Sequence, residues 1–321
     1  MRLGLLSTAK INGETIRAAA ESDRVELVAV ASRDESTAAA YAREHGLERA
    51  HGSYEALLED DEVDAVYVSL PNGLHHEWSL RALRAGKHVL CEKPYSRRPA
   101  DVEEAYDVAA AAGLVLLEGF MYRHHPQTRR VQQLVGEGAI GALRSVRATF
   151  GFVLDDLANV RALSELDGGA LMDVGCYCIS GARLLAGEPV RVSGEQVVGS
   201  TGVDMAFYGT LRHAGDVISQ IEASFVAPRR QRLEAIGSEG MLVVDAPWRA
   251  DWAGELVLVR GDSTETLTVE RANPYRLQLE NLADAIEGKA EPLLGRADAL
   301  GQARTLDALY RAAQCGAAVT L

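Results

Sequence analysis

Long apolar runs are missing from this chain of 321 residues. The longest nearly apolar stretch, residues 108–117, is about half of the roughly 20 residues that a membrane-spanning helix needs, and Gly113 interrupts it. At the N-terminus, Ser7, Thr8 and Lys10 follow before an apolar segment of signal-peptide length is complete. We therefore expect no membrane partner, and we expect the first residues to form a strand.

Positive charge is also scarce. The chain has 33 lysines and arginines against 46 aspartates and glutamates, a formal net charge of -13. Nucleic acids and anionic membrane surfaces bind proteins that carry excess cation on one face, so this balance disfavours both partners. Small molecules and other protein chains remain as partners. Nearly all the basic residues are arginine, so each lysine is a candidate for a special role: Lys10, Lys87, Lys93 and Lys289.

Patterns for metal ligands and disulfides are absent as well. The cysteines Cys91, Cys176, Cys178 and Cys315 include no C-x-x-C pair, and the histidines include no H-E-x-x-H pattern. We expect structural thiols in a protein of the reducing cytoplasm, and no metal site.

Residues 1–120 alternate strand-like and helix-like segments. Residues 25–31 and 63–70 are buried-strand runs rich in valine, and helical patterns occupy residues 11–20, 35–44 and 74–85. Repeated strand-helix-strand units with short connections imply a parallel sheet with helices on both faces. We therefore predict a doubly wound α/β domain of the Rossmann type over residues 1–120.

Residues 121–321 follow another rhythm. Helical patterns at residues 125–136 and 168–186 precede a series of short strand-like runs from residue 190 to residue 269, and two helices close the chain. Strands with turn residues and no helices between them favour an antiparallel sheet. We predict an α+β substrate-binding domain with a large open sheet. An uncovered apolar face would favour a homodimer or homotetramer through that sheet.

Ligands of doubly wound sheets bind beyond the carboxyl ends of the strands. After the first strand, the sequence Ser7-Thr8-Ala9-Lys10-Ile11 replaces the dinucleotide fingerprint G-x-G-x-x-G and has none of its glycines. Small side chains there still allow a pyrophosphate to approach the backbone N–H groups that open the next helix. An ordinary strand-to-helix turn explains the sequence equally well.

The end of the second strand discriminates between cofactors. An NAD site usually places an acidic residue there for the ribose hydroxyls, whereas a 2'-phosphate requires a hydroxyl and a guanidinium. Ser32 and Arg33 occupy this position, which favours NADP over NAD. The alternative is a solvated surface arginine.

Two later strands end in distinctive residues. One is followed by Leu70-Pro71-Asn72 and His75, and the next by Glu92-Lys93-Pro94. A lysine at the mouth of a parallel sheet is a candidate catalytic cation, and Pro94 restricts the direction of Lys93, with a cis bond as one way to do so. Alternatively, Lys93 is a surface ion-pair partner of Glu92.

The second half of the chain contributes Asp173 and Tyr177. Residues four apart lie on one face of a helix, so both side chains can reach one ligand. A core tyrosine with an aspartate near a helix start is the competing interpretation.

In this order, these segments resemble the glucose-fructose oxidoreductase and inositol dehydrogenase family (Gfo/Idh/MocA). Glu92-Lys93-Pro94 is similar to its E-K-P motif, whose lysine is catalytic, and Pro71-Asn72 with His75 is similar to P-N-x-x-H. Asp173 matches the acid of D-x-x-x-H, with Tyr177 in place of histidine. With residues 118–127, this tyrosine resembles the NADP-dependent D-xylose dehydrogenases, dihydrodiol dehydrogenases and glucose-fructose oxidoreductase. Ala9 departs from the glycine usual in relatives.

The resemblance implies a set of site residues. The cofactor would contact the segments at the strand ends, namely Ser7, Thr8, Ala9, Lys10, Ile11, Ser32, Arg33, Leu70, Pro71, Asn72, His75, Glu92, Lys93 and Pro94. The substrate would contact Lys93, Tyr122, Arg123, Asp173 and Tyr177.

For alcohol oxidation we expect Tyr177 to remove the hydroxyl proton, with Lys93 supplying the cation that lowers the pKa of the phenol. Asp173 would orient Lys93 or accept a sugar hydroxyl. Oxidation of an aldose at C1 to the lactone is the first expectation, followed by reduction of a keto-sugar and then by a cyclic dihydrodiol. A catalytically silent NADP-binding sensor is the alternative of another class.

Overall fold

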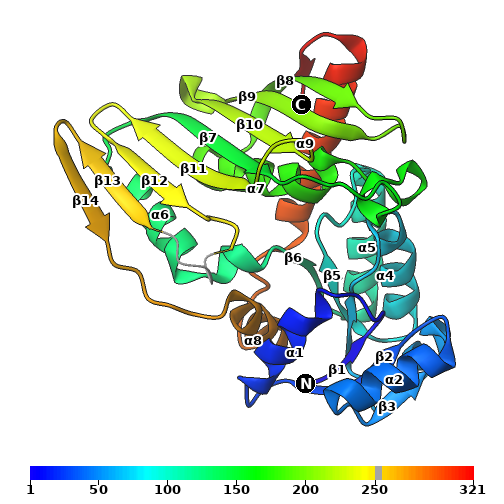
Figure 1. Ribbon diagram of the computed structural model, residues 1–321. Helices are drawn as coiled ribbons and strands as arrows, with labels where there is room; N and C mark the ends of the chain where they lie inside the picture. The colour runs from blue at the N-terminus through cyan, green and yellow to red at the C-terminus, as the bar shows by residue number, and fades with distance from the viewer. Residues whose placement is uncertain (250–254) are drawn as a thin grey trace. The chain divides into compact units, whose positions relative to one another are not determined.

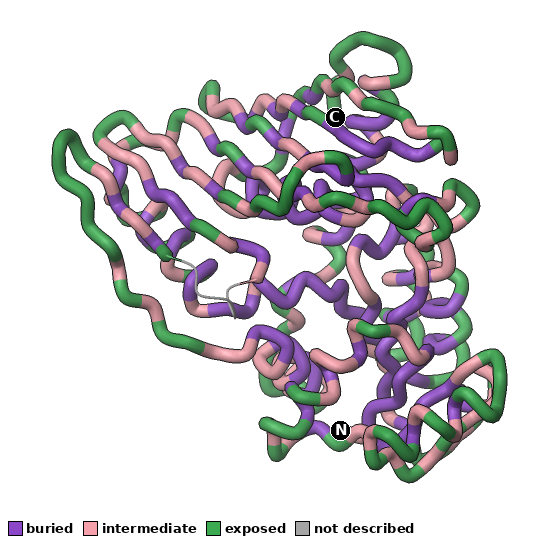
Figure 2. Tube along the Cα trace, in the orientation of Figure 1, coloured by how far each residue is buried: buried purple, intermediate pink, exposed green. Residues whose placement is uncertain are grey.

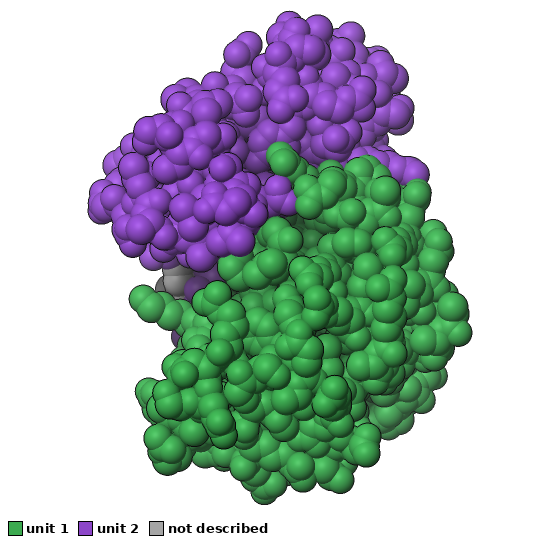
Figure 3. All heavy atoms as spheres, turned by 90° about the vertical axis from the view of Figure 1, so that its right-hand side faces the viewer, with its two compact units in different colours: residues 1–121, 275–300 green, residues 122–274, 301–321 purple. Residues whose placement is uncertain are grey.

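The structure of the protein, a computed structural model, describes residues 1–249 and 255–321. The chain divides into two compact units, residues 1–121 with 275–300 and residues 122–274 with 301–321 (Figures 1 and 3). A six-stranded sheet lies in the first unit and a nine-stranded sheet in the second.

The first unit is a doubly wound parallel sheet, as predicted. The strand order is β3-β2-β1-β4-β5-β6, and each of these pairings is parallel. The chain builds outward from β1 in one direction and then returns to add β4 on the other side, so the strand order reverses between β1 and β4. The strands are β1 (Arg2–Leu5), β2 (Glu26–Ala31), β3 (Arg49–His51), β4 (Ala65–Val68), β5 (His88–Glu92) and β6 (Leu116–Gly119).

Helices connect these strands, and their ends follow from local sequence. Gly46 and Gly113 have positive φ angles of 69° and 66° and end α2 and α5, a backbone conformation that glycine adopts without strain. Between the helices, β4 is completely buried, which explains its unbroken apolar sequence. The helices are α1 (Asn12–Ala20), α2 (Glu35–His45), α3 (Tyr54–Leu58), α4 (His75–Arg84), α5 (Pro99–Ala112) and, from later in the chain, α8 (Pro274–Ile286).

The second unit contains the open, mainly antiparallel sheet that the sequence predicts. Its order is β14-β13-β12-β11-β7-β10-β9-β8-β15, and β7 with β10 is a parallel pair within it. The strands are β7 (Leu143–Gly151), β8 (Pro189–Val198), β9 (Asp204–His213), β10 (Ile218–Ser224), β11 (Arg230–Gly237), β12 (Met241–Asp245), β13 (Leu256–Arg260), β14 (Ser263–Leu267) and β15 (Val319–Thr320).

Helix α7 (Cys176–Ala186) packs on one face of this sheet, against β7, β10 and β11. Burial alternates along β11 accordingly: Leu233 and Ala235 are buried, whereas Arg230 and Arg232 are exposed (Figure 2). The unit also includes α6 (Pro126–Gly136) and most of α9 (Arg296–Cys315).

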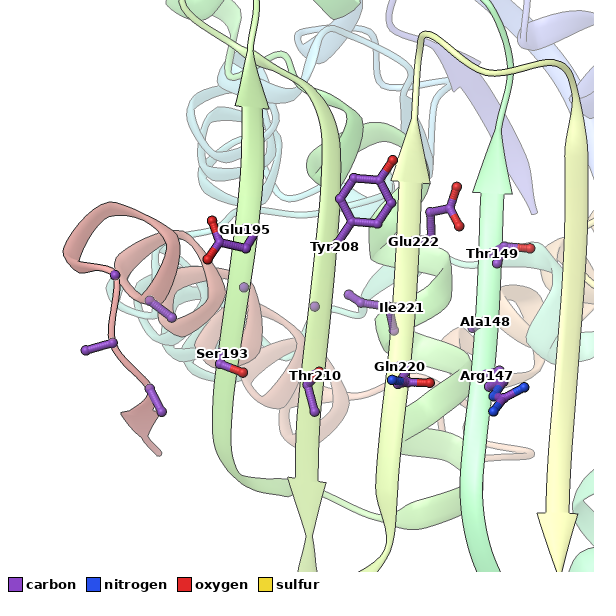
Figure 4. A pocket seen from close by; sticks show the side chains of 16 residues that line it. Arg147, Ala148, Thr149, Ser193, Glu195, Tyr208, Thr210, Gln220, Ile221 and Glu222 are labelled. Carbon is purple, nitrogen blue, oxygen red and sulfur yellow. The ribbon is translucent and has the colours of Figure 1, made fainter.

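The uncovered face of the nine-stranded sheet is mainly polar over strands β7, β8, β9 and β10. Figure 4 shows Arg147, Glu195, Glu222 and Tyr208 on it, around a hollow of about 560 Å³. Aliphatic residues also reach this face: Val197 lies on the same side of β8 as Glu195 and is 56% exposed, and Val243 and Val257 belong to the row of Glu234. The face that we expected to be apolar is therefore mixed.

The predicted helix over residues 168–186 begins differently from a regular α-helix. Residues Leu171–Gly175 form a π-helix, η5, and the α-helix α7 starts only after it. No helix among the described residues is both long enough and apolar enough to cross a bilayer.

Candidate active site

The turn between β1 and α1 is held to the end of β4. The Ser7 hydroxyl donates to the carbonyl oxygen of Ser69 at 3.0 Å and also lies 2.7 Å from the Ser69 hydroxyl. Asn12, the first residue of α1, donates from its side chain to the Ser7 carbonyl at 2.7 Å. The predicted segment Ser7–Ile11 therefore lies at the point where the strand order of the sheet reverses.

This turn leaves backbone donors available. Within the described residues, the N–H groups of Thr8, Lys10 and Ile11 donate to no other group of the chain. These donors precede the first turn of α1, the end of a helix that favours anions. The side chain of Ala9 adds little bulk there, so the turn can receive a phosphate although it has no glycine.

Ser32 and Arg33 follow β2 as predicted. Arg33 is exposed, and no ion pair of its guanidinium occurs among the described residues. The neighbouring acid, Asp34, caps α2: it accepts hydrogen bonds from the Ser36 and Thr37 hydroxyls and from the Thr37 N–H, each at 2.7 Å. These bonds lower the pKa of Asp34 to about 2. The acid at this strand end thus serves the helix, while the guanidinium remains available to a ligand.

His75 joins the loops that follow β4 and β5. Its side chain is 1% exposed, with Nδ1 2.8 Å from the Pro94 carbonyl oxygen and Nε2 2.8 Å from the Leu70 carbonyl oxygen. The ring lies between two acceptors, and a neutral imidazole donates its one N–H to one of them at a time. Its position links the segment Leu70–Asn72 with the Lys93–Pro94 turn. The Lys93–Pro94 peptide bond is cis.

Glu92 and Lys93 stand at the carboxyl end of β5, where both are half-buried. The Tyr67 hydroxyl on β4 donates to Glu92 Oε1 at 2.5 Å, and the Lys93 N–H donates to Glu92 Oε2 at 3.3 Å. Burial and the Glu92 charge raise the pKa of Tyr67 well above its usual value, so this phenol stays a donor. Gly119 on β6 allows the close approach of β5 at this point, since a Cβ there would lie 3.0 Å from the Cys91 carbonyl oxygen.

Asp173 lies on the π-helix η5 of the second unit. Its Oδ2 accepts a hydrogen bond from Arg161 Nε at 2.8 Å, and its side chain is 13% exposed. Arg161 belongs to the short helix η3 (Val160–Ala162), whose position is fixed by a hydrogen bond from the Gly169 N–H to the Arg161 carbonyl at 2.8 Å. The π-turn changes the offset between Asp173 and Tyr177 from that of a regular α-helix.

Tyr177 lies at the start of α7 in an aromatic cluster. Its ring centroid is 5.5 Å from Phe150, 5.8 Å from Tyr122 and 6.0 Å from Trp248. Trp248 is completely buried and donates from its indole N–H to the Thr149 carbonyl at 3.2 Å. The surrounding rings fix the direction of the Tyr177 side chain.

Tyr122 and Arg123 connect the short helix η2 (Met121–His124) to α7. The Tyr122 hydroxyl donates to the Ser180 hydroxyl oxygen at 2.7 Å, and Arg123 Nη1 donates to the same atom at 3.2 Å. Ser180 lies on α7 one turn beyond Tyr177. These two predicted substrate residues therefore support the Tyr177 helix.

Several site residues escaped the sequence reasoning. Tyr67 was hidden in an apolar strand, although a hydroxyl in a completely buried strand requires a partner and so signals one. Arg161, Phe150 and Trp248 lie far from Asp173 and Tyr177 along the chain, and no short motif includes them.

Comparison with known proteins follows the same division of the chain. Residues 1–120 match the oxidoreductase family with an NAD-binding Rossmann fold, and residues 128–243 match the GFO/IDH/MocA C-terminal domain. D-xylose 1-dehydrogenase (NADP(+)) 2 of Haloferax volcanii is 39% identical over 325 residues, covering 100% of both chains. Trans-1,2-dihydrobenzene-1,2-diol dehydrogenase of Xenopus tropicalis is 30% identical over 262 residues, covering 80% of this chain and 78% of the relative.

A solved structure agrees over nearly the whole chain. KijD10, a 3-ketoreductase from Actinomadura kijaniata in complex with NADP and TDP-benzene, superposes with a TM-score of 0.92 at 32% identity, covering 97% of each chain. The family resemblance inferred from the E-K-P, P-N-x-x-H and D-x-x-x-Y segments is confirmed. This chain belongs to the GFO/IDH/MocA oxidoreductase family.

Proposed function

We propose that this protein is an NADP-dependent oxidoreductase that oxidises an aldose such as D-xylose at C1 to the lactone. The observation that carries the proposal is full-length similarity to a D-xylose 1-dehydrogenase in a chain that has Lys93, Asp173 and Tyr177. The half-buried ring of Phe150 beside Tyr177 supports it, because an aromatic face packs well against the apolar face of a sugar ring.

The residues at the end of β2 fit NADP. A 2'-phosphate needs a cation, and Arg33 offers an exposed guanidinium without an ion pair among the described residues. The acid that follows Arg33, Asp34, caps α2 through its Oδ1. The N–H groups at the start of α1 would hold the pyrophosphate.

When bound, NADP accepts the hydride from the sugar carbon. Tyr177 takes the proton of the reacting hydroxyl as general base. A phenol has a pKa near 10, so it needs a cation to act near neutral pH. Lys93 supplies that charge. At about 4 Å and an effective dielectric constant near 20, the attraction is roughly 4 kcal/mol before desolvation losses. Asp173, held by Arg161, would orient a sugar hydroxyl or the Lys93 ammonium.

Other residues of the first unit prepare these groups. His75 lies between the carbonyl oxygens of Leu70 and Pro94 and so links the loops around Asn72 and Pro94. The Tyr67 hydroxyl fixes Glu92, and Glu92 receives the Lys93 N–H. The residues before and after Lys93, Glu92 and Pro94, are therefore both held by contacts, and these contacts fix the backbone from which the Lys93 side chain extends.

A panel assay tests the proposal directly. Purified protein is mixed with NADP or NAD and with aldoses, keto-sugars and cyclic diols, and the absorbance of the reduced nicotinamide is followed. We expect reduction of NADP with an aldose and slower reduction of NAD. Reduced nicotinamide forming with none of these compounds would contradict the proposal.

Reduction of a keto-sugar is the second candidate. It is supported by the structural similarity to KijD10, a 3-ketoreductase. The same acid and base would run in the opposite direction, with Tyr177 donating the proton. Oxidation of NADPH by a keto-sugar, faster than reduction of NADP by any aldose, would favour this direction.

A self-associated protein is also part of the proposal, as a homodimer or homotetramer through the uncovered face of the nine-stranded sheet. Arg147, Glu195 and Glu222 give this face both signs of charge, and Tyr208 is 47% exposed there. A two-fold axis could pair such charges reciprocally. We place the protein in the cytoplasm, since its buried cysteines are free thiols.

A further inference from the structure

Gln231 lies on the face of the nine-stranded sheet that α7 covers. In the antiparallel pair of β11 with β7, Gln231 is directly opposite Phe150, and Leu233 is opposite Ala148. Directly paired residues in an antiparallel sheet project their side chains to the same face. Gln231 and Phe150 therefore form one row of this face, and Leu233 and Ala148 form the next.

Each of these two rows lies opposite a particular residue of helix α7. A Cβ at Gly181 would lie 2.6 Å from the Trp248 ring and 3.6 Å from Leu233, so Gly181 sits over the row of Leu233. Tyr177 lies one turn earlier on α7, and its ring centroid is 5.5 Å from that of Phe150. The row of Gln231 and Phe150 is thus the row that Tyr177 reaches.

This row is also where the covered face opens. Leu233 and Ala148 are 4% and 1% exposed, whereas Gln231 and Phe150 are both half-buried. The Gln231 row is therefore less completely covered by packing than the next row.

The amide of Gln231 has no hydrogen bond within the described part of the chain. Its Oε1 and Nε2 are both shielded from solvent and both unpartnered. Shielded polar groups are nearly always paired, and an unpaired one is destabilising. A primary amide offers two donors and one acceptor oxygen, and a sugar hydroxyl can satisfy either group. Beside it, the Phe150 and Tyr177 rings offer apolar surface for the C–H face of the same ligand.

We propose that Gln231 is a substrate-binding residue that hydrogen-bonds a hydroxyl of the sugar on a carbon other than the reacting one. This inference rests on the proposed function, since it takes the substrate of Tyr177 to be a polyhydroxylated ring. It assigns to Gln231 the selection among sugars that differ at one hydroxyl. Gln231 does not take part in proton transfer.

The test uses Gln231→Met, which keeps the length of the side chain and removes both polar atoms. Its control is Gln132→Met, at an exposed position on α6. For each protein, kcat/KM is measured with the best aldose and with its monodeoxy analogues. We expect the wild type to lose about tenfold in kcat/KM for one analogue, the size of one hydrogen bond. In Gln231→Met, the ratio of kcat/KM for the full sugar to kcat/KM for this analogue should fall from about ten to about one. The same ratio for each of the other analogues should stay unchanged.

Stability separates this role from a structural one. Because the amide bonds nothing among the described residues, Gln231→Met should have a melting temperature equal to or above that of the wild type. A lower melting temperature with unchanged ratios would assign the residue to the scaffold and overturn the proposal.

The outcomes distinguish the two proposals. Wild-type turnover with all monodeoxy ratios retained in Gln231→Met overturns the role of Gln231 alone. Calorimetric titration of the same sugars into the NADP-loaded proteins reads the discrimination without turnover, so a wild type that binds sugars without oxidising them still tests Gln231. A wild type that neither oxidises nor binds any of them overturns both.

Discussion

A phenol is a weak base near neutral pH, and Tyr177 needs a cation to act as one. Lys93 is the candidate that the strand end of β5 provides. The scarcity of lysine in the chain already singled it out, whereas most arginines of the structure pair with surface acids, as Arg2 does with Glu62 and Asp64.

Removal of either group should stop turnover. Lys93→Met and Tyr177→Phe are each expected to lower kcat at least about 100-fold, the lower end for an acid or base group. NADP affinity should stay near the wild-type value. The matched controls are Lys289→Met and Tyr208→Phe, both at surface positions, which should leave kcat unchanged. Wild-type turnover in Lys93→Met or Tyr177→Phe would remove that residue from the mechanism.

Arg33 should decide the choice between cofactors. Arg33→Ala removes the guanidinium proposed for the 2'-phosphate, and a charge-assisted hydrogen bond of about 1.5–3 kcal/mol corresponds to roughly a 10- to 100-fold loss in NADP affinity. NAD affinity should change little. Fluorescence titration with both cofactors measures this, with Arg43→Ala on α2 as the control. Equal losses for NADP and NAD would refute the 2'-phosphate assignment.

Single site residues were predictable where they belong to a sequence motif or where, as with lysine, their residue type is rare in the chain. Lys93, Asp173 and Tyr177 stand in recognisable segments, and Ser32-Arg33 follows a clear strand. Arg161 and Gln231 could not be found in that way. Arg161 contacts Asp173 because of the conformation of the loop between them, which has no sequence motif. Gln231 was singled out by its pairing with Phe150, and the register of two strands cannot be derived from the sequence alone.

At the scale of elements, the junction of η2 and α6 carries a titratable group in an unusual position. His124 is 1% exposed, and neither ring nitrogen has a hydrogen-bond partner among the described residues. Burial, followed by repulsion from Arg129 and Arg123, lowers the pKa of His124 to about 3. The imidazole therefore stays neutral in the folded protein.

This histidine should make the protein sensitive to acid. The unfolded chain binds the proton near pH 6.5 and the folded chain only near pH 3, so stability falls as the pH drops through that window. At pH 5 the loss is about 2 kcal/mol. Urea unfolding of wild type and His124→Phe at pH 7 and pH 5 measures it.

The decrease between the two pH values should be smaller in His124→Phe by about that amount. Part of the decrease in unfolding free energy should remain in His124→Phe, because burial also lowers the pKa of His88 and His213. Identical decreases in the two proteins would contradict a buried neutral His124.

Element types followed from sequence more reliably than their details. The parallel sheet was predictable from strand runs such as β4, whose complete burial makes it uniformly apolar. The short strands β3 and β15 were not expected, because three and two residues carry no periodic pattern. The π-helix η5 was missed because an α-helical pattern and a π-turn share the same residues. It forms where Gly175 allows the close approach of Ala223, to which a Cβ would lie 3.0 Å away.

At the scale of the whole molecule, the first compact unit recruits residues 275–300 from late in the chain. Sequence order suggested a division near residue 120, because the strand-helix rhythm stops there. Nothing in the local pattern of α8 tells which sheet it accompanies, since amphipathic helices of similar composition suit either.

The uncovered face of the nine-stranded sheet should determine the oligomeric state. Sedimentation velocity at micromolar concentration is expected to give a dimer or tetramer. Tyr208→Arg, which replaces an aromatic ring in the middle of this face by a long charged side chain, should shift the protein toward the monomer without changing the fold. A wild-type monomer, or an unchanged oligomer in Tyr208→Arg, would contradict assembly through this face.

Hydride transfer from the sugar carbon to NADP is the most direct test of the proposed reaction. D-xylose carrying deuterium at C1 is incubated with the protein and NADP, and the reduced cofactor is analysed by mass spectrometry. A C1 dehydrogenase transfers the label, so deuterated NADPH and the lactone should form together, more slowly than with unlabelled sugar. NADPH without deuterium, or no reduced cofactor at all, would contradict oxidation at C1.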